Sequence, residues 1–288
     1  MMSGDGTISL PGGARMPSYG CGTWQMGEDA RHHPREVAAL RAALDAGVRM
    51  IDTAEMYAEG GAEKIVGEAI AGRREDVFLV SKVYPHNAGF DEMQRAAHAS
   101  LERLGVDAVD LYLLHWPGQI PLEETVAAFE HLRAQGAIRG WGVSNFDPDD
   151  IEVLNEAVAV NRVSDPKGSC QVNQVLYHLG ARGIEWDLVP AADVGGIPLM
   201  AYSPLGQGAL LTAPAIEAIA ERQDVSPAVV ATAWTMRSGR IAAIPKTADP
   251  ERAKENAKAR DLTLDPDDLA QLDAAFPPPD CPEPLGVI

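Results

Sequence analysis

The chain has 288 residues, of which 46% are hydrophobic and 23% charged, an ordinary composition for a soluble globular protein whose length suits one large domain. With 42 acidic against 24 basic residues its formal net charge is −18, which disfavours nucleic acid and anionic membranes as partners. Three widely spaced cysteines without a Cys-x-x-Cys pair argue against a disulfide framework and a zinc site, so we expect a cytoplasmic protein without a bound metal.

The N-terminal sequence MMSGDGTISLPGG has neither a basic stretch nor an apolar core, so we expect no secretory signal. No apolar run in the chain approaches the roughly 18 residues of a membrane-spanning helix. The two short runs TISL and ARMPSYG flank Pro-Gly-Gly, a pattern that predicts a β-hairpin ahead of the main fold.

After this hairpin, a short apolar run, a polar or glycine-rich turn and an amphipathic stretch recur along the chain. Strands are expected at 48–52, 76–82, 109–116, 138–145, 169–175, 197–203 and 241–246, with 19–24 as a weaker first member. Helical stretches between them include 34–47, 90–105, 121–136 and 226–239, which end at or next to glycine.

The spacing of these strands predicts the fold class. The residues that close the strands are Gly22, Asp52, Lys82, His115, Ser144, Gln174, Ser203 and Lys246, at intervals of 30, 30, 33, 29, 30, 29 and 43 residues. Helix-length crossovers imply parallel strands, and eight such units indicate an α/β fold, a (β/α)8 TIM barrel with an N-terminal β-hairpin, as a single domain over 1–288. The long last interval has room for two helical stretches, at 214–222 and 226–238. The alternative, an open doubly wound sheet, usually carries a G-x-G-x-x-G motif that is absent here.

Polar residues stand at the ends of three consecutive expected strands. Asp52, Lys82 and His115 close strands two, three and four, and Tyr57 follows Asp52 by five residues. Each has an ordinary structural explanation: a helix cap, a solvated lysine, a packed histidine or a satisfied core hydroxyl. Their joint occurrence at the carboxyl ends of barrel strands, where barrel enzymes carry their chemistry, favours an active site.

These four residue types predict a proton donor beside an oxyanion site. Tyrosine has a reference pKa of about 10, and an ammonium such as Lys82 favours the phenolate. Asp52 would keep Lys82 charged, and His115 could orient a carbonyl oxygen. The set contains neither a nucleophile nor a metal, so a hydride cofactor must supply the electrons.

Seven motifs between residue 7 and Pro279 resemble the aldo-keto reductase family. They are GVRMIDTAEMYAEGGAEKIVGEAI, VSKVYP, DLYLLHWP, GWGVSNF, QVNQV, MAYSPLGQG and IPKTADPERAKENA. The resemblance implies that Asp52, Tyr57, Lys82 and His115 form the catalytic tetrad, with Tyr57 as general acid. It also implies an extended NADPH/NADP+ across the barrel mouth, in contact with Gly22, Thr23, Ser144, Asn145, Gln174, Tyr202, Ser203, Leu205, Gly206, Lys246, Thr247, Arg252 and Asn256.

The preference for NADPH over NADH is expected to depend on Arg252. Residues 240–260 hold six basic and three acidic residues, a local charge of +3 in an acidic chain. A phosphate site near strands seven and eight is common in barrels, although a helix of mixed surface charge is the alternative.

The expected pocket is open, because the connection PGQIP after Trp116 is short and only a dozen residues follow Phe276. Trp24 and Trp116 are predicted walls of the substrate pocket, with a buried core tryptophan as the alternative for Trp24. The family's frequent QVELHP reads QVLYHL here, which keeps Gln174 but puts neighbouring contacts in doubt.

The predicted function is NADPH-dependent reduction of small aldehydes and ketones by a monomer. One alternative is a regulatory protein that keeps the barrel and cofactor but turns over little. Another is a carboxylate-based hydrolase, which would need two acidic groups at one site, whereas the expected strand ends offer only Asp52.

Overall fold

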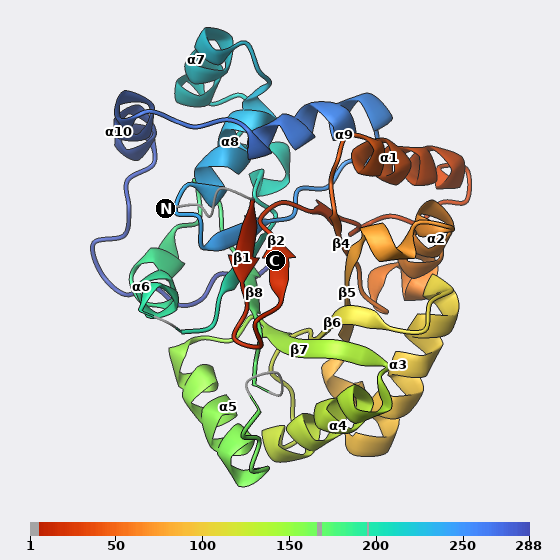
Figure 1. Ribbon diagram of the computed structural model, residues 1–288. Helices are drawn as coiled ribbons and strands as arrows, with labels where there is room; N and C mark the ends of the chain where they lie inside the picture. Colours follow the sequence, from red (N-terminus) through yellow and green to blue (C-terminus); the bar gives the residue numbers. More distant parts are fainter. Residues whose placement is uncertain (1–5, 166–168, 195) are drawn as a thin grey trace.

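A computed structural model describes residues 6–165, 169–194 and 196–288 (Figure 1). The predicted N-terminal hairpin is confirmed: β1 (Thr7–Ser9) pairs antiparallel with β2 (Arg15–Pro17). Eight parallel strands follow in the sheet order β10-β9-β8-β7-β6-β5-β4-β3. These are β3 (Cys21–Gly22), β4 (Met50–Asp52), β5 (Phe78–Val83), β6 (Val109–Leu114), β7 (Ile138–Ser144), β8 (Asn173–Leu176), β9 (Leu199–Tyr202) and β10 (Ile241–Ala243).

Backbone bonds between the two ends of this sheet close it into a ring. Tyr19 forms a parallel bridge with Ala243, the Gly20 N–H donates to the Ala243 carbonyl at 2.9 Å, and the Ala243 N–H donates to the Ser18 carbonyl at 2.9 Å. A side chain on Gly22 would not fit at this seam, because a Cβ there would lie 2.9 Å from the Ile244 oxygen. The (β/α)8 barrel expected from the spacing is therefore confirmed.

Helices surround the barrel, as Figure 1 shows. They are α1 (His33–Asp45), α2 (Gly61–Ile70), α3 (Phe90–Leu104), α4 (Leu122–Gln135), α5 (Pro148–Val160), α6 (Leu188–Asp193), α7 (Pro214–Gln223), α8 (Pro227–Met236), α9 (Pro250–Asn256) and α10 (Pro266–Ala275). Helix α3 ends at a glycine as expected: Gly105, with a φ of 66°, is its left-handed C-cap. The two helical stretches expected between the last two strands are α7 and α8. Helix α1 ends at Asp45, ahead of the expected Gly47.

Most predicted strands differ from the observed ones by one or two residues at an end, and two boundaries differ by more. The strand expected at 169–175 begins only at Asn173, because its neighbour β9 starts after Pro198, which has no N–H to give to an earlier rung. Strand β10 ends at Ala243, three residues before Lys246, and Pro245 likewise interrupts the ladder.

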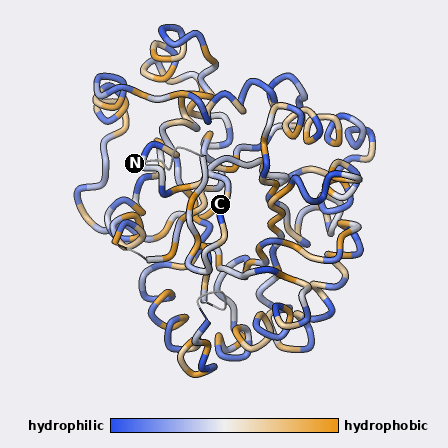
Figure 2. Tube along the Cα trace, in the orientation of Figure 1, coloured by the Kyte–Doolittle hydropathy of each residue, from blue (hydrophilic) through white to orange (hydrophobic). Residues whose placement is uncertain are grey.

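The barrel interior is closed below the site by apolar side chains. Met50, Val80, Leu111 and Met200 pack there with Met16 of the hairpin. Between strands and helices lies a larger core, in which the rings of Phe129 and Trp141 stack at 5.1 Å. Figure 2 shows the matching pattern, with apolar and polar segments alternating along the outer helices. The packed interior leaves the carboxyl ends of the strands as the place for a binding cavity.

Candidate active site

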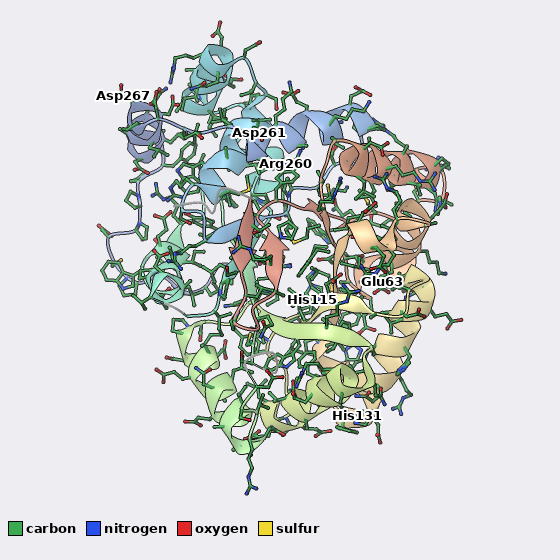
Figure 3. The ribbon with its side chains drawn as sticks, viewed as in Figure 1. Glu63, His115, His131, Arg260, Asp261 and Asp267 are labelled. Atoms are coloured by element: carbon green, nitrogen blue, oxygen red, sulfur yellow. The ribbon has the colours of Figure 1, made fainter. Side chains whose placement is uncertain are left out.

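The barrel brings the four predicted catalytic side chains together. Asp52 is the last residue of β4, Lys82 is the second-last of β5, and His115 directly follows β6. Tyr57 opens a 3₁₀ turn, Tyr57–Gly60, just beyond β4. Figure 3 shows His115 near the middle of the molecule, whereas His131 lies on the outer helices. Consecutive parallel strands thus deliver the set to one edge of the sheet.

Lys82 is the hub of this group and is fully buried. Its ammonium donates to Asp52 Oδ2 at 2.6 Å, to the Thr53 carbonyl at 2.9 Å and to the Tyr57 hydroxyl at 3.2 Å. The other Asp52 oxygen accepts from Gln174 Nε2 at 2.7 Å. Each buried charge therefore has partners, and the chain of contacts ends on the Tyr57 hydroxyl.

Burial and charge act in opposite senses on these groups. Burial disfavours the charged form of Lys82, but the charges of Asp52 and Tyr57 and the hydrogen bonds to both together outweigh it, so the pKa of Lys82 is raised. Burial raises the pKa of Tyr57, and although Lys82 acts to lower it as expected, the net shift is upward. Tyr57 is thus a protonated phenol at neutral pH, held next to a cation that would stabilise the phenolate.

His115 lies beside Tyr57 as a neutral imidazole. The two rings are 5.7 Å apart in an edge-on arrangement, and the His115 ring is 4.9 Å from that of Trp116. Burial, assisted by the Lys82 charge, lowers the pKa of His115 to about 2. The imidazole Nδ1 has no hydrogen-bond partner among the described residues. His115 can therefore donate one N–H without carrying a positive charge.

A cavity of about 800 Å³ opens at this edge of the barrel. Its lining comprises Gly22, Thr23, Trp24, Asp52, Met56, Tyr57, His115, Trp116, Ser144, Asn145, Gln174, Tyr202, Ser203, Ile244, Lys246 and Ile288. Trp24 is 36% exposed there, which excludes the alternative of a buried core tryptophan. Five of the predicted cofactor contacts are not among the lining residues: Leu205, Gly206, Thr247, Arg252 and Asn256.

Asn145 organises the cavity wall opposite Tyr57. It adopts a left-handed φ of 58°, a conformation that asparagine tolerates better than most residues. Its Nδ2 donates to the His115 carbonyl at 3.2 Å, and its Oδ1 accepts from the Tyr202 hydroxyl at 2.9 Å. Ser144 and Gln174 lie in the neighbouring strands β7 and β8 and are buried. The wall is thus a fixed set of amide and hydroxyl groups.

Two cations of residues 240–260, one of them in the cavity wall, form no ion pair within the described parts of the chain. Of the six basic residues in 240–260, Arg240, Lys254 and Lys258 form ion pairs, and Arg260 donates to the carbonyls of residues 46 and 47. Lys246 and Arg252 remain, with Lys246 in the cavity wall and Arg252 exposed on α9. Burial lowers the pKa of Lys246, opposed by Glu36 and Glu28. The mixed-charge alternative therefore describes the ion-paired residues Lys254 and Lys258, and the positive charge left for an anion is that of Lys246 and Arg252.

The segment after Phe276 departs from the expected open pocket. Instead of stopping short, it reaches the cavity, where Ile288 forms part of the wall. A backbone hydrogen bond from Ile288 reaches the Tyr202 hydroxyl, whose pKa burial raises to about 12. Figure 1 shows the chain leaving α10, passing α6 and ending near the centre of the barrel in projection. The sequence gives no signal for this path, because the residues after Phe276 belong to no strand–helix repeat.

Other kinds of site find no support in the described residues. Within residues 6–165, 169–194 and 196–288, no group of three or more His, Cys, Asp or Glu side chains could hold a metal ion. No helix in those ranges is both long and apolar enough to cross a membrane. Cys21, Cys170 and Cys281 are free thiols.

Comparisons with known proteins agree with this geometry. Residues 19–276 match the sequence model of the aldo/keto reductase family. The methylglyoxal reductase YeaE of Escherichia coli is 50% identical over 277 residues, 94% of this chain and 95% of that protein. The glyoxal reductase of Bacillus subtilis is 36% identical over 272 residues, 93% of this chain and 92% of that protein. The crystal structure of an aldo/keto reductase from Klebsiella pneumoniae in complex with NADP and acetate has a TM-score of 0.92 and 47% identity, covering 98% of this chain and 99% of that one. The chain therefore belongs to the aldo/keto reductase family.

Proposed function

We propose that this protein is an NADPH-dependent reductase of small aldehydes and ketones, with 2-oxoaldehydes such as methylglyoxal as its preferred substrates. One observation carries the proposal: the buried Asp52–Lys82–Tyr57 chain ends at a cavity that also holds a neutral imidazole. The names of the relatives, methylglyoxal reductase and glyoxal reductase, support the substrate class.

The donor set of the cavity fits a nicotinamide dinucleotide phosphate. Ser144, Asn145 and Gln174 offer amide and hydroxyl groups to a carboxamide, and Tyr202 offers an aromatic face. Lys246 and Arg252 offer positive charge and form no ion pair among the described residues, which leaves them available to an anionic phosphate. Ser203 and Gly206, with φ of 49° and 54°, form a tight turn after β9 on which a pyrophosphate can rest. Thr23, Leu205, Thr247 and Asn256 remain proposed contacts of the same cofactor.

The reduced nicotinamide, when bound, supplies a hydride to the carbonyl carbon. Tyr57 gives its phenolic proton to the carbonyl oxygen, so that the double bond becomes an alcohol. The Lys82 ammonium, kept charged by Asp52, stabilises the phenolate that remains. His115 donates one N–H to the carbonyl oxygen and holds it next to Tyr57. The positive charge stays on Lys82 throughout, since His115 is neutral.

The dimensions of the cavity favour a small substrate. The cavity of about 800 Å³, part of which is open to solvent, must hold both the reacting end of a dinucleotide and the carbonyl compound. Trp24, Trp116 and Ile288 bound this space with apolar surface. Lys246 is the only lysine or arginine among the described residues that line the cavity, so a neutral dicarbonyl suits the site.

We also propose that the whole chain, 1–288, is a single domain that acts as a cytoplasmic monomer, without nucleic-acid or membrane partners. The ring closure between residues 18–20 and Ala243 supports one folding unit. The net charge of −18 and the three free thiols support the remaining points. Light scattering after size exclusion would test the monomer.

The direct test of function follows the absorbance of the reduced nicotinamide with methylglyoxal, glyoxal, a simple ketone and a bulky aromatic ketone, each with NADPH and with NADH. We expect the highest kcat/KM with methylglyoxal and NADPH, and an alcohol product by chromatography. Tight NADPH binding with no turnover of any carbonyl would instead support the regulatory alternative.

A further inference from the structure

The segment 277–288, called the strap below, crosses from α10 to the cavity. It starts with Pro277, Pro278 and Pro279. Because a run of prolines is stiff, the orientation of the chain at Phe276 sets the direction in which the strap begins. Further along, Leu285 packs against a hydrophobic core cluster, and Gly286 lies so near Leu176 that a Cβ would sit 3.2 Å from that side chain.

The far end of the strap has little burial of its own. Val287 and Ile288 are 64% and 62% exposed, although Ile288 lines the cavity. Weakly buried residues are held in place mainly by the chain that leads to them. The position of Ile288 therefore depends on the chain before it, which is held by the packing of Leu285 and by the way the beginning of the strap is fixed.

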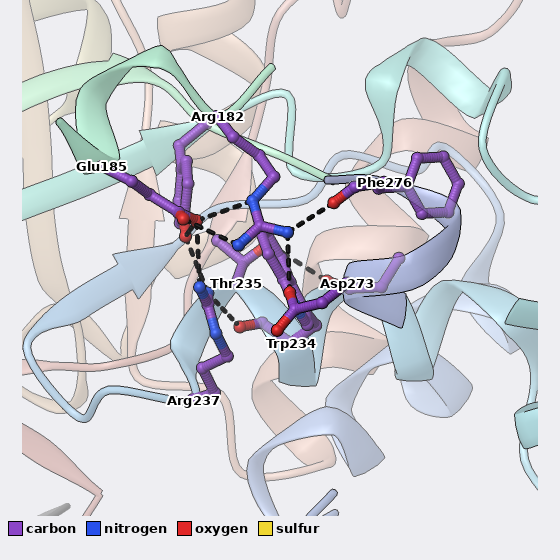
Figure 4. A network of polar contacts seen from close by, with 9 residues as sticks. Arg182, Glu185, Trp234, Thr235, Arg237, Asp273 and Phe276 are labelled. Carbon is purple, nitrogen blue, oxygen red and sulfur yellow. Dashed lines mark hydrogen bonds and ion pairs between the residues drawn. The ribbon is translucent and has the colours of Figure 1, made fainter. Parts of the chain in front are cut away.

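A buried charge cluster fixes that beginning, as Figure 4 shows. Arg182 Nη1 donates to the Phe276 carbonyl at 2.5 Å and to Asp273 Oδ1 at 2.7 Å. The same guanidinium holds Glu185 through Nη2 at 2.7 Å, and Arg237 binds Glu185 at 2.9 Å. Arg182 is only 7% exposed, in the loop between β8 and α6.

The cluster connects this loop to α8 as well as to α10. The guanidinium carbon of Arg237 lies 3.9 Å from the centre of the Trp234 ring in α8, and that of Arg182 lies 5.0 Å from it. Tyr177 donates its hydroxyl to Glu185 and accepts from Arg237 at 2.7 Å. Because Tyr177, Arg182 and Glu185 lie in the stretch of chain that directly follows β8, Arg182 relates the strap to the strand that carries Gln174.

We propose that Arg182 is a positioning residue of the reduction, which determines carbonyl size selectivity by holding the strap so that Ile288 stays in the cavity wall. This rests on the proposed function, because selectivity has meaning only if the cavity takes a carbonyl. The guanidinium bridges Phe276 and Asp273 on the strap side to Glu185 on the barrel side.

The kinetic experiment compares Arg182→Gln with wild type, using methylglyoxal and a bulky aromatic ketone at saturating NADPH. We expect kcat for methylglyoxal to stay within about twofold, because the tetrad is not touched. The ratio of kcat/KM for the bulky ketone to that for methylglyoxal should rise roughly tenfold, the usual worth of one apolar contact in a pocket. Arg182→Lys, which keeps the charge, should restore part of the wild-type ratio.

Arg133→Gln is the matched control. Arg133 also pairs with a glutamate three residues away, Glu130, and with a second carboxylate, Asp165. The same Glu130 accepts from the indole of Trp141, so this cluster has similar chemistry without a contact to the strap. The control should leave the size ratio unchanged.

Ile288→Ala and Asp273→Asn keep the inference testable if Arg182→Gln folds poorly. Asp273 is half-exposed and Ile288 exposed, so neither change threatens the core. Ile288→Ala should raise the ratio of kcat/KM for the bulky ketone to that for methylglyoxal, as Arg182→Gln does. The variant that combines Arg182→Gln with Ile288→Ala should raise this ratio no further, since both changes act through one strap. Asp273→Asn should shift it in the same direction by less.

A second readout needs no turnover. Cys281 lies in the strap and is exposed, whereas Cys21 and Cys170 are buried, so a thiol spin label at Cys281 reports strap motion. Arg182→Gln should increase its mobility, and Arg133→Gln should not. Additive effects of Arg182→Gln and Ile288→Ala, or equal label mobility in both arginine variants, would overturn the inference. Failure of the proposed function is distinct, since wild type would then show no carbonyl reduction at all.

Discussion

Two buried clusters in this protein contain the same kinds of side chain but differ in what their tyrosines can do. In the candidate active site, Tyr57 accepts one hydrogen bond from Lys82 and faces the cavity. In the second cluster, Tyr177 donates to Glu185, accepts from Arg237 and is 1% exposed. A tyrosine, a carboxylate and a cation thus form the candidate reactive group in one place and link separate elements of the fold in the other.

The two clusters differ in how many hydrogen bonds the tyrosine hydroxyl already makes and in whether a ligand can reach it. They do not differ in the kinds of side chain they contain. Burial raises the pKa of both phenols, with Lys82 acting against it at Tyr57 and Arg237 at Tyr177. Only Tyr57 has hydrogen-bonding capacity directed to a space that a ligand can enter. A sequence search for tyrosines near charged residues would therefore find both clusters, and only the barrel geometry separates them.

The largest expected effect tests this difference directly. Tyr57→Phe should lower kcat for methylglyoxal by roughly 10²–10⁴-fold, because a general acid is removed. NADPH binding, measured by fluorescence titration, should change little. Tyr177→Phe is the matched variant and should keep kcat within a few-fold. Equal losses of kcat in the two variants would contradict the assignment of Tyr57.

The second cluster should matter for stability instead. Glu185→Gln removes a carboxylate that burial would protonate but that Arg182, Tyr177 and Arg237 hold at a lowered pKa. Breaking such a buried pair should lower the free energy of unfolding by about 3 kcal/mol in urea titrations. The exposed pair Glu92–Arg95 provides the control: Glu92→Gln should cost less than about 1 kcal/mol. A Glu185→Gln protein as stable as wild type would show that the cluster is not a tie.

A smaller effect, on the affinity for NADPH, should distinguish Arg252, which forms no ion pair in the described structure, from the ion-paired Lys254 on the same helix α9. Arg252→Ala should raise the Kd for NADPH by roughly ten- to a hundredfold, the worth of a hydrogen bond to a charged group, and leave that for NADH unchanged. Lys254, already paired with Glu251 at 2.7 Å, is the control, and Lys254→Ala should have little effect on either. Unchanged NADPH affinity in Arg252→Ala would remove this residue from the phosphate site.

The smallest effect is a pH dependence of stability that belongs to the active-site cluster. The folded-state pKa of His115 is lowered to about 2, first by burial and then by Lys82. Below a reference pKa of about 6.5, the unfolded chain binds a proton there and the folded chain does not, so stability falls as pH falls. Between pH 6 and 4, this group lowers the free energy of unfolding of the wild type by up to about 1.4 kcal/mol for each pH unit. His115→Asn should remove that part of the slope, as measured by urea titration at each pH. Identical slopes in both proteins would rule out a buried neutral imidazole.

The barrel and the gathering of Asp52, Lys82 and His115 at one edge were predictable from the sequence because both follow from repetition. A strand every thirty or so residues implies parallel strands, and parallel strands place their closing residues, such as Asp52 and Lys82, at one edge. The prediction needed no knowledge of contacts between distant residues, since each unit repeats the previous one.

The strap and the Arg182 cluster were not predictable in this way. Ile288 and Phe276 belong to no repeat, and the partners of Arg182 come from three separate stretches of chain, around Glu185, Trp234 and Asp273. Strand ends also shifted where prolines remove donors, as at Pro198 and Pro245, an effect that depends on the neighbouring strand. Such features depend on which non-repeating residues meet in space.

The seam of the barrel has a consequence for how the protein is made. Residues 18–22 pair with residues 243–245, which leave the ribosome last among the strands. Until then, the first strand has an unpaired edge, and long-range pairing of this kind forms slowly. Asp52, Lys82 and His115 can gather on three adjacent early strands before that point, whereas Lys246 joins them only when synthesis is nearly complete. We therefore expect a nascent chain halted before residue 241 to expose a strand edge with unpaired backbone groups, which is prone to aggregation, and to depend on chaperones.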